Sequence, residues 1–216
     1  SIGVGLDTFG RALRNGVSGA SEITVLDTRG FASNRGCELK GFDATRWVKR
    51  LDVDDVGRSS QFAIAAARLA IEDAGLAAET LSRHGCGVSV GTTEGESQEL
   101  DQLTEVWVKQ GPDKMRPAQL SRASADLLSA SVSHELDLHG EALTISTACA
   151  AGNYAIGYAF DLIQLGEADY MLCGGADAMS RKSFSGFYRL GAIAPQACQP
   201  FDKNRKGILT GEGAGM

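Results

Sequence analysis

ALTISTACAAGNYAIGYAFDLIQLGEADYMLCGGADAM, residues 142–179, is the stretch that decides the fold. A short apolar run over 142–146 predicts a strand, and the apolar segment over 150–165 predicts a helix. A second apolar run over 169–175 predicts another strand, of the fully buried type. The helix carries a single charged residue, Asp161, so we expect it to be buried on most sides. Strand, helix and strand in this order indicate an α/β unit with helices packed on a sheet.

The segments that precede this stretch extend the same alternation. SSQFAIAAARLAIEDAGL, residues 59–76, predicts a helix, because Ser59 and Ser60 are candidate N-caps, its face is rich in alanine and a glycine stands near its end. The remaining predicted elements are strands over 86–91 and 208–216 and helices over 96–109 and 121–135, whereas residues 1–50 predict no element. Strands that alternate with helices favour an α/β fold.

Composition excludes several classes of function. The chain has 216 residues, with 43% hydrophobic and 22% charged residues, which is typical of a globular protein and excludes general disorder. Its 21 Lys and Arg against 27 Asp and Glu give a net charge of -6, which argues against a nucleic-acid partner. No apolar run is long enough to span a bilayer, so we expect no membrane association either.

The five cysteines predict free thiols. They are Cys37, Cys86, Cys149, Cys173 and Cys198. An odd count without the paired spacing of metal ligands is typical of reduced, intracellular thiols and not of a disulfide framework. We therefore expect a cytoplasmic protein without a metal site and, since no other motif demands one, without a cofactor.

Cys149 is the candidate nucleophile. It lies between a predicted strand and a long predicted helix, and free N–H groups and the dipole at a helix N-terminus favour a thiolate. The same N–H groups could stabilise an oxyanion on a thioester carbonyl. Small neighbours leave room for a substrate: Ala148, Ala150, Ala151 and Gly152. The alternative from the residues alone is a structural cysteine in a small-residue turn.

Four motifs in order resemble the β-ketoacyl-acyl-carrier-protein synthases of the elongating type. STACAAG covers 146–152, GEADYMLCGGAD covers 166–177, the region of Phe187 follows, and PFDKNRKGILTGEGAGM covers 200–216. The resemblance extends back through the predicted strand over 86–91 and covers nearly all of the chain. It implies a thiolase-like fold with α/β/α/β/α layers, built from a duplicated domain of which residues 1–216 would be the N-terminal part.

The resemblance also implies a reaction and partners. Cys149 would accept an acyl group from an acyl carrier protein, and a carbanion formed by decarboxylation of malonyl-carrier protein would attack the resulting thioester. The pathway would be fatty-acid or polyketide synthesis, and the synthase would work as a homodimer or a heterodimer. No cofactor is implied.

Two histidines and a lysine complete the site of this family, and their motifs do not occur here. His84, His134 and His139 stand in other contexts, typical of surface or helix-terminal histidines. We therefore expect the chain to be the N-terminal portion of a longer synthase, whose second half carries those residues.

The resemblance assigns four further residues to the acyl pocket. Glu94 falls where the family has an apolar gatekeeper, Ala118 and Gln119 fall on a pocket wall that is often aromatic, and Phe187 resembles the aromatic residue at its border. A carboxylate beside a long saturated chain would be costly, which favours short, polar or unsaturated acyl groups. The alternative is that Glu94 turns to solvent, or that its loop is displaced, while Phe187 serves core packing.

Two rival classes remain open at this point. A non-condensing partner subunit of a heterodimeric synthase usually lacks the nucleophile, which is present here. A thiolase shares the fold and the nucleophile but differs in the sequence around the cysteine. A pure binding module would leave the cysteine and its small neighbours without a purpose.

Overall fold

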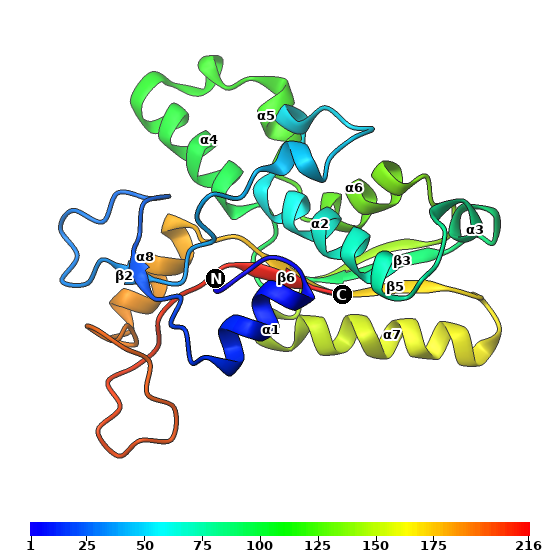
Figure 1. Cartoon of the computed structure of the whole chain (residues 1–216). Coiled ribbons are helices and arrows are strands. Elements are labelled where there is room, and N and C mark those ends of the chain that lie inside the picture. The colour runs from blue at the N-terminus through cyan, green and yellow to red at the C-terminus, as the bar shows by residue number, and fades with distance from the viewer. The chain divides into compact units, whose positions relative to one another are not determined.

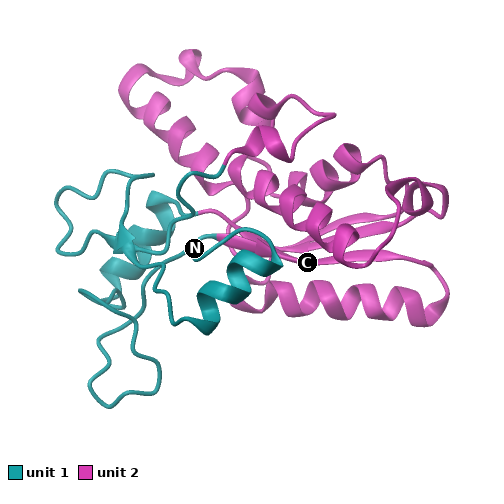
Figure 2. Cartoon of the chain, viewed as in Figure 1, with its two compact units in different colours: residues 1–42, 179–212 teal, residues 43–178, 213–216 magenta.

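The computed structural model describes residues 1–216, which divide into two compact units (Figures 1 and 2). Unit 1 combines Ser1–Phe42 with Met179–Glu212, and unit 2 combines Asp43–Ala178 with Gly213–Met216. Each unit therefore contains segments that are far apart in the sequence, and residues 142–178 of the deciding stretch belong to unit 2.

A four-stranded sheet forms the centre of unit 2. Its strands are β3 (Gly87–Gly91), β4 (Ala142–Ile145), β5 (Met171–Asp177) and β6 (Gly213–Gly215), in the order β4-β3-β5-β6. β3 runs parallel to both β4 and β5, and β6 is antiparallel to β5. The predicted strands over 86–91, 142–146 and 169–175 are confirmed, as is the α/β class.

Helices cover both faces of this sheet (Figure 1). α2 (Arg58–Asp73) and α6 (Leu127–Leu136) pack on one face and on each other. α7 (Ala151–Leu165) packs along β3 and β5 on the other face. This sandwich follows from the parallel strands, because each crossover returns the chain to the same end of the sheet through a helix.

Unit 2 has three further α-helices: α3 (Ala78–Arg83), α4 (Ser97–Gln110) and α5 (Pro117–Arg122). The helices predicted over 59–76 and 96–109 are confirmed as α2 and α4.

The prediction of one continuous helix over 121–135 is wrong. α5 ends at Arg122, and α6 begins only at Leu127. In the break between them the Ser124 hydroxyl donates to the Asp126 carboxylate. Small polar side chains that bond locally in this way compete with the backbone hydrogen bonds of a helix.

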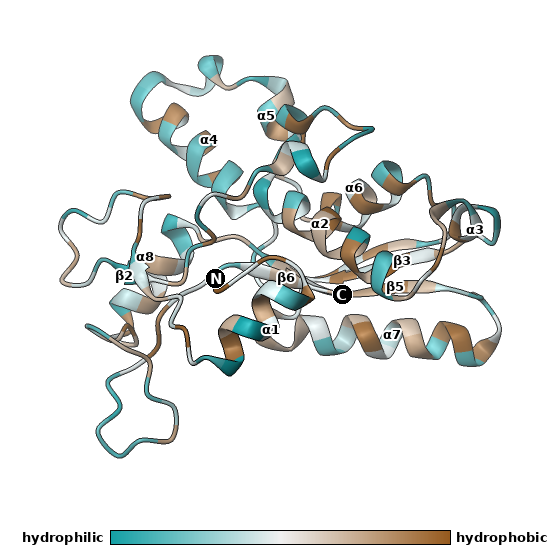
Figure 3. Ribbon diagram, in the orientation of Figure 1, coloured by the Kyte–Doolittle hydropathy of each residue, from teal (hydrophilic) through white to brown (hydrophobic).

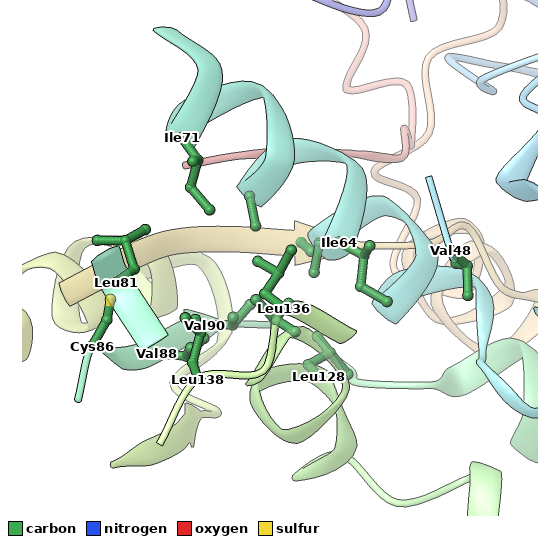
Figure 4. Close-up of a cluster of buried hydrophobic side chains, with 14 of the residues drawn as sticks. Val48, Ile64, Ile71, Leu81, Cys86, Val88, Val90, Leu128, Leu136 and Leu138 are labelled. Carbon is green, nitrogen blue, oxygen red and sulfur yellow. The ribbon is translucent and has the colours of Figure 1, made fainter. Parts of the chain in front are cut away.

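The main core lies between the sheet and the pair α2–α6 (Figure 4). Ala63 and Ala67 of α2 are completely buried, and their small size lets this helix approach its neighbours closely. Larger aliphatic side chains fill the remaining space: Ile64, Leu81, Val88, Val90, Leu128 and Val132. Burial of these side chains holds the helices on the strands.

The prediction that α7 is buried on most sides is wrong in this structure. Its buried residues are three alanines spaced four apart, Ala151, Ala155 and Ala159, which form a narrow stripe. The sheet covers only that stripe. Several apolar residues outside this stripe are exposed, and Figure 3 shows brown segments along the helix. Its exposed large side chains are Tyr154, Ile156, Phe160, Ile163 and Leu165.

Unit 1 contains three elements in the range 1–50, for which the sequence predicted none. They are α1 (Leu6–Arg14), β1 (Ser21–Glu22) and β2 (Arg35–Gly36), the last two being an antiparallel pair. α8 (Arg181–Arg189) belongs to the same unit. Pairing over only two residues explains why no alternation of apolar and polar residues marked these strands.

The core of unit 1 is small and partly aromatic. Ile23, Met179 and Phe184 are buried together. The ring of Phe31 packs in T-shaped geometry against the rings of Phe184 and Tyr188, with centroid distances of 5.1 and 4.9 Å. The strand predicted over 208–216 forms only in part, because Ile208 makes an isolated bridge to Ile193 within unit 1 and only Gly213–Gly215 joins the sheet of unit 2.

We predict opposite effects for two glycine substitutions in unit 2. Gly91→Ala would place a Cβ 2.2 Å from the carbonyl carbon of Ala151, in rigid backbone, and should destabilise the fold by on the order of 3 kcal/mol. Gly157→Ala, on the exposed side of α7 with nothing within 4 Å, should stabilise it by about 0.5–1 kcal/mol. Chemical denaturation of both variants of the whole protein measures the difference. Equal effects would show that the end of β3 does not lie against α7.

Candidate active site

Cys149 lies where β4 leads into α7. It is the central residue of the 3₁₀ turn Ala148–Ala150, which continues directly into the helix, as the sequence predicted. Ala148 has a φ of 54°, a left-handed backbone conformation that costs a non-glycine residue about 1–3 kcal/mol. The side chain of Cys149 is exposed. The strained turn therefore presents the thiol at the surface of unit 2.

The carboxyl ends of three parallel strands meet at this turn. Gly91, the last residue of β3, pairs with Ile145 of β4 on one side and with Gly175 of β5 on the other. The N–H of Thr92 then donates to the Ile145 carbonyl at 3.0 Å. In sheets of this kind ligands bind at the carboxyl edge. Cys149 thus stands at the edge where a substrate is expected.

Glycines at this edge let the backbones of the sheet and of α7 touch. A Cβ on Gly91 would meet the Ala151 carbonyl carbon at 2.2 Å and the Gly152 nitrogen at 2.4 Å. A Cβ on Gly175, on the neighbouring strand β5, would lie 3.6 Å from the Gly152 Cα. The small residues after Cys149 therefore serve close packing on β3, whereas Ala148 and Cys149 remain exposed.

The turn that follows β3 is held by Asp177, the last residue of β5. The Asp177 carboxylate accepts hydrogen bonds from the Thr92 hydroxyl at 2.7 Å, from the Thr93 N–H at 2.8 Å and from the Glu94 N–H at 3.3 Å. The Thr92 hydroxyl in turn accepts from the Gly95 N–H at 2.9 Å. A carboxylate that collects several N–H donors makes strong, charge-assisted hydrogen bonds.

A second carboxylate anchors the other end of this turn. Glu96 is buried, and its two oxygens accept from the N–H groups of Ser59 at 3.1 Å and Ser60 at 2.8 Å, at the start of α2. Neither serine caps the helix through its own side chain, so the N-cap prediction is wrong: the N-cap residue is Gly57 and the acceptor comes from a distant loop.

Burial raises the pKa of Glu96 above its usual range, against the hydrogen bonds from Ser60 and Ser59 that lower it. Protonated Glu96 therefore contributes to the free energy of unfolding at low pH. That contribution is lost as the pH rises through the pKa that Glu96 has in the folded state.

Glu94 lies between these two anchors and is half-buried. The Ser97 hydroxyl, at the start of α4, donates to the Glu94 backbone carbonyl at 2.7 Å and to its Oε2 at 3.1 Å. The side chain therefore has a polar partner within the protein and is not simply turned to solvent.

The other predicted pocket residues lie on two further elements. Ala118 is exposed and Gln119 half-buried on α5, which an ion pair between Arg122 and Glu99 of 3.1 Å links to α4. Phe187 is half-buried on α8 and belongs to unit 1. Unit 2 thus brings Cys149 and the turn that carries Glu94 to one edge of the sheet, and holds Ala118 and Gln119 on a separate helix.

Sequence reasoning missed Asp177 and Glu96. Asp177 lies two residues beyond the strand predicted over 169–175, and nothing in the sequence indicates which loop it holds. Glu96 is the first residue of the helix predicted over 96–109, and its contact with α2 has no signal in the sequence. The three histidines are exposed, and none belongs to the 92–96 turn or to the turn around Cys149.

No group of three or more His, Cys, Asp or Glu side chains is arranged to hold a metal ion. None of the helices has the length and apolar character needed to cross a membrane.

We predict that Cys149 is the cysteine most reactive toward iodoacetamide in the whole protein. It is exposed beside a helix N-terminus, whereas burial raises the pKa of the Cys86 and Cys173 thiols and makes their thiolates scarcer. Time-resolved peptide mapping measures the order of modification, with Cys149→Ala as the control. Faster labelling of Cys37 or Cys198 would contradict the assignment.

An α/β fold with a cysteine between a parallel strand and a helix, at the carboxyl edge of the sheet, agrees with the thiolase-like class that the sequence resemblance implies. Residues 1–216 match the family described as "Beta-ketoacyl synthase, N-terminal domain". The chain belongs to this family.

Known proteins agree with this assignment. A relative named 3-oxoacyl-[acyl-carrier-protein] synthase 2, from Synechocystis sp., is 34% identical over 222 residues, which cover 100% of this chain and 53% of that protein. A Staphylococcus aureus protein of the same name is 32% identical over 215 residues, 97% of this chain and 53% of its own length. The chain spans about half the length of these relatives.

Two solved structures share the fold. "The ishigamide ketosynthase/chain length factor" is 47% identical with a TM-score of 0.95, over 98% of this chain and 53% of that one. The ketosynthase structure titled "AntDE:AntF (apo): type II PKS acyl-carrier protein in complex with its ketosynthase bound to the hexaketide" is 26% identical with a TM-score of 0.82, over 99% of this chain and 53% of that one. The predicted thiolase-like class is confirmed.

Proposed function

We propose that the whole protein is a β-ketoacyl-acyl-carrier-protein synthase and that Cys149 carries the acyl group. The observation that supports this most is the position of Cys149, exposed in a strained turn at the N-terminus of α7, where three strand ends meet. Residues 1–216 would form the N-terminal part of its ketosynthase domain.

The chemistry would proceed in two steps. The Cys149 thiolate attacks the acyl thioester carbonyl, a new C–S bond forms, and the carrier thiolate leaves and takes up a proton. A malonyl thioester then loses CO2, and the electron pair released attacks the acyl-Cys149 carbonyl, which forms a C–C bond and expels the Cys149 thiolate. Backbone N–H groups of this strand-to-helix turn would stabilise the oxyanion in each step, although the Ala151 N–H already donates to the Ala148 carbonyl.

The partners would be acyl-loaded and malonyl-loaded carrier proteins and a second synthase subunit. Similar structures are titled as a ketosynthase with its acyl-carrier protein and as a ketosynthase "in Complex with its Chain Length Factor", the latter from Xenorhabdus doucetiae. We propose a dimer, either of identical subunits or with such a partner. A cytoplasmic location fits the five free thiols.

The acyl group would be short, polar or unsaturated. Glu94 contributes a carboxylate where the family resemblance expects an apolar wall, and it is anchored near the edge that carries Cys149. Ala118 and Gln119, which belong to the same unit, would line a further part of the pocket. Apolar chains would lose free energy wherever they desolvate such polar groups without pairing them.

A non-condensing partner subunit is the second candidate. The presence and exposure of Cys149 favour a condensing subunit instead, because a non-condensing one needs no nucleophile at this position. The thiolase alternative is disfavoured by the match of the whole chain to the synthase family.

Cys149→Ala in the whole protein should abolish acyl loading and condensation, since no nucleophile remains. The fold should be retained, because one small residue replaces another at an exposed site. Cys149→Ser should accept acyl groups only slowly, since a hydroxyl is a weaker nucleophile without a strong base. Intact mass spectrometry after incubation with acyl-carrier thioester measures the adduct. An undiminished adduct in Cys149→Ala would place the nucleophile elsewhere.

We further predict that the wild type loads a short or polar-unsaturated acyl group faster than a long saturated one, and that Glu94→Ile reverses part of this preference. Isoleucine would restore an apolar wall and remove the cost of desolvating a carboxylate. Loading rates across a chain-length series of acyl-carrier thioesters test this by intact mass.

Glu105→Ile is the matched control for that series. Glu105 is an exposed residue of α4 that pairs with Lys109. The Glu105→Ile variant therefore makes the same type of substitution at a position outside the turn. If the wild type loads all chain lengths equally and Glu94→Ile behaves like Glu105→Ile, Glu94 does not face the acyl group.

A further inference from the structure

Asp177 stands in a position to control the turn that carries Glu94. Asp177 is the last residue of β5 and is half-buried. In the sheet, β3 lies between β5 and β4, the strand that leads to Cys149. One oxygen of Asp177 accepts from three groups in sequence, the Thr92 hydroxyl and the N–H groups of Thr93 and Glu94. The second oxygen accepts from the Thr93 N–H at 3.1 Å.

The rest of the turn is fixed from the opposite side. The Ser59 hydroxyl donates to the Gly95 carbonyl at 2.8 Å and accepts from the Ala178 N–H at 3.1 Å. Glu96 holds the start of α2, as described above. Both ends of the turn are therefore anchored. Between them, Asp177 holds the N–H groups of Thr93 and Glu94, while the Ser97 hydroxyl binds the Glu94 carbonyl.

We propose that Asp177 is a positioning residue for acyl selection, which holds the Thr92–Gly95 turn so that Glu94 stands at the sheet edge beside Cys149. This inference rests on the proposed synthase function. Asp177 itself need not touch the acyl group. Its carboxylate acts through the backbone of the turn, and a displacement of about 1 Å in such a support can change the rate of a positioned reaction on the order of 100-fold.

The anchoring does not depend on sequence proximity. β3 and β5 are paired from Gly87↔Met171 to Gly91↔Gly175, so the residues that follow Gly91 and Gly175 emerge side by side. Asp177 is therefore delivered to the turn by the register of the sheet. A shift of the carboxylate, or loss of its charge, would release Glu94 without disturbing the strands.

Glu135 provides a matched control within unit 2. This buried carboxylate collects the N–H groups of Lys49, Arg50 and Leu51 at 2.7–3.0 Å and also binds Arg68. It resembles Asp177 in the number of donors it holds, but the segment it anchors is remote in sequence from both turns at the sheet edge. Glu135→Gln should lower stability without changing acyl selection.

The experiment compares Asp177→Asn, Thr92→Val and Glu135→Gln in the whole protein. Thr92→Val removes the hydroxyl that joins Asp177 to Gly95 while the backbone contacts of Asp177 remain, so it tests the same support with a smaller risk to folding. The readout is the ratio of Cys149 loading rates for a long saturated and a short acyl-carrier thioester, measured by intact mass. Melting temperature and iodoacetamide labelling of Cys149 report on folding separately.

We expect Asp177→Asn and Thr92→Val to raise the long-to-short ratio by about threefold or more, and Glu135→Gln to leave it unchanged. In a Glu94→Ile background, Asp177→Asn should add little, because residues that act through one another are not additive. An unchanged ratio in both turn variants, an equal shift in Glu135→Gln, or a full effect of Asp177→Asn without Glu94 would overturn the inference. If wild-type Cys149 accepts no acyl group from any carrier thioester, the proposed function itself fails.

Discussion

The close approach of Gly91 to the first turn of α7 is the contact on which the site depends. A Cβ at Gly91 would meet the backbone of Ala151 and Gly152 at 2.2–2.4 Å, so the end of β3 and the start of the helix can touch only because Gly91 has no side chain. This contact sets the position of the turn that holds Cys149. It also sets where the chain leaves β3 toward Glu94.

Three carboxylates hold backbone segments of unit 2 by accepting their N–H groups. Asp177 holds the turn after β3, Glu96 closes the N-terminus of α2, and Glu135 binds three successive N–H groups near Lys49. Burial tends to raise the pKa of Glu135, but the N–H groups and Arg68 outweigh it and hold that pKa below its usual range. Glu96 has fewer donors, and burial prevails. Desolvation, the number of donors and the charge of the neighbours together set the direction of each pKa.

Helix α7 shows how one element can serve two environments. Its alanine stripe fits the sheet, while Tyr154, Phe160 and Leu165 leave an apolar surface exposed in this chain. A helix with a single charged residue, Asp161, can be buried on most sides or can pack through a narrow stripe, and the sequence does not distinguish the two. The expectation of burial on most sides failed for this reason, although the helix itself was predicted over nearly the observed range.

The sequence by itself determined the alternation of strands and helices, the place of Cys149 between β4 and α7 and the family, because local periodicity, glycine and contiguous motifs record these features directly. Only the tertiary structure decided that Asp177 meets Thr93 and that Glu96 caps α2, since those partners are 84 and 36 or 37 residues apart in the chain. Strand register and helix packing bring them together. Hydrogen bonds between such distant groups leave no periodic trace in the sequence, because each requires only one polar residue at the right place.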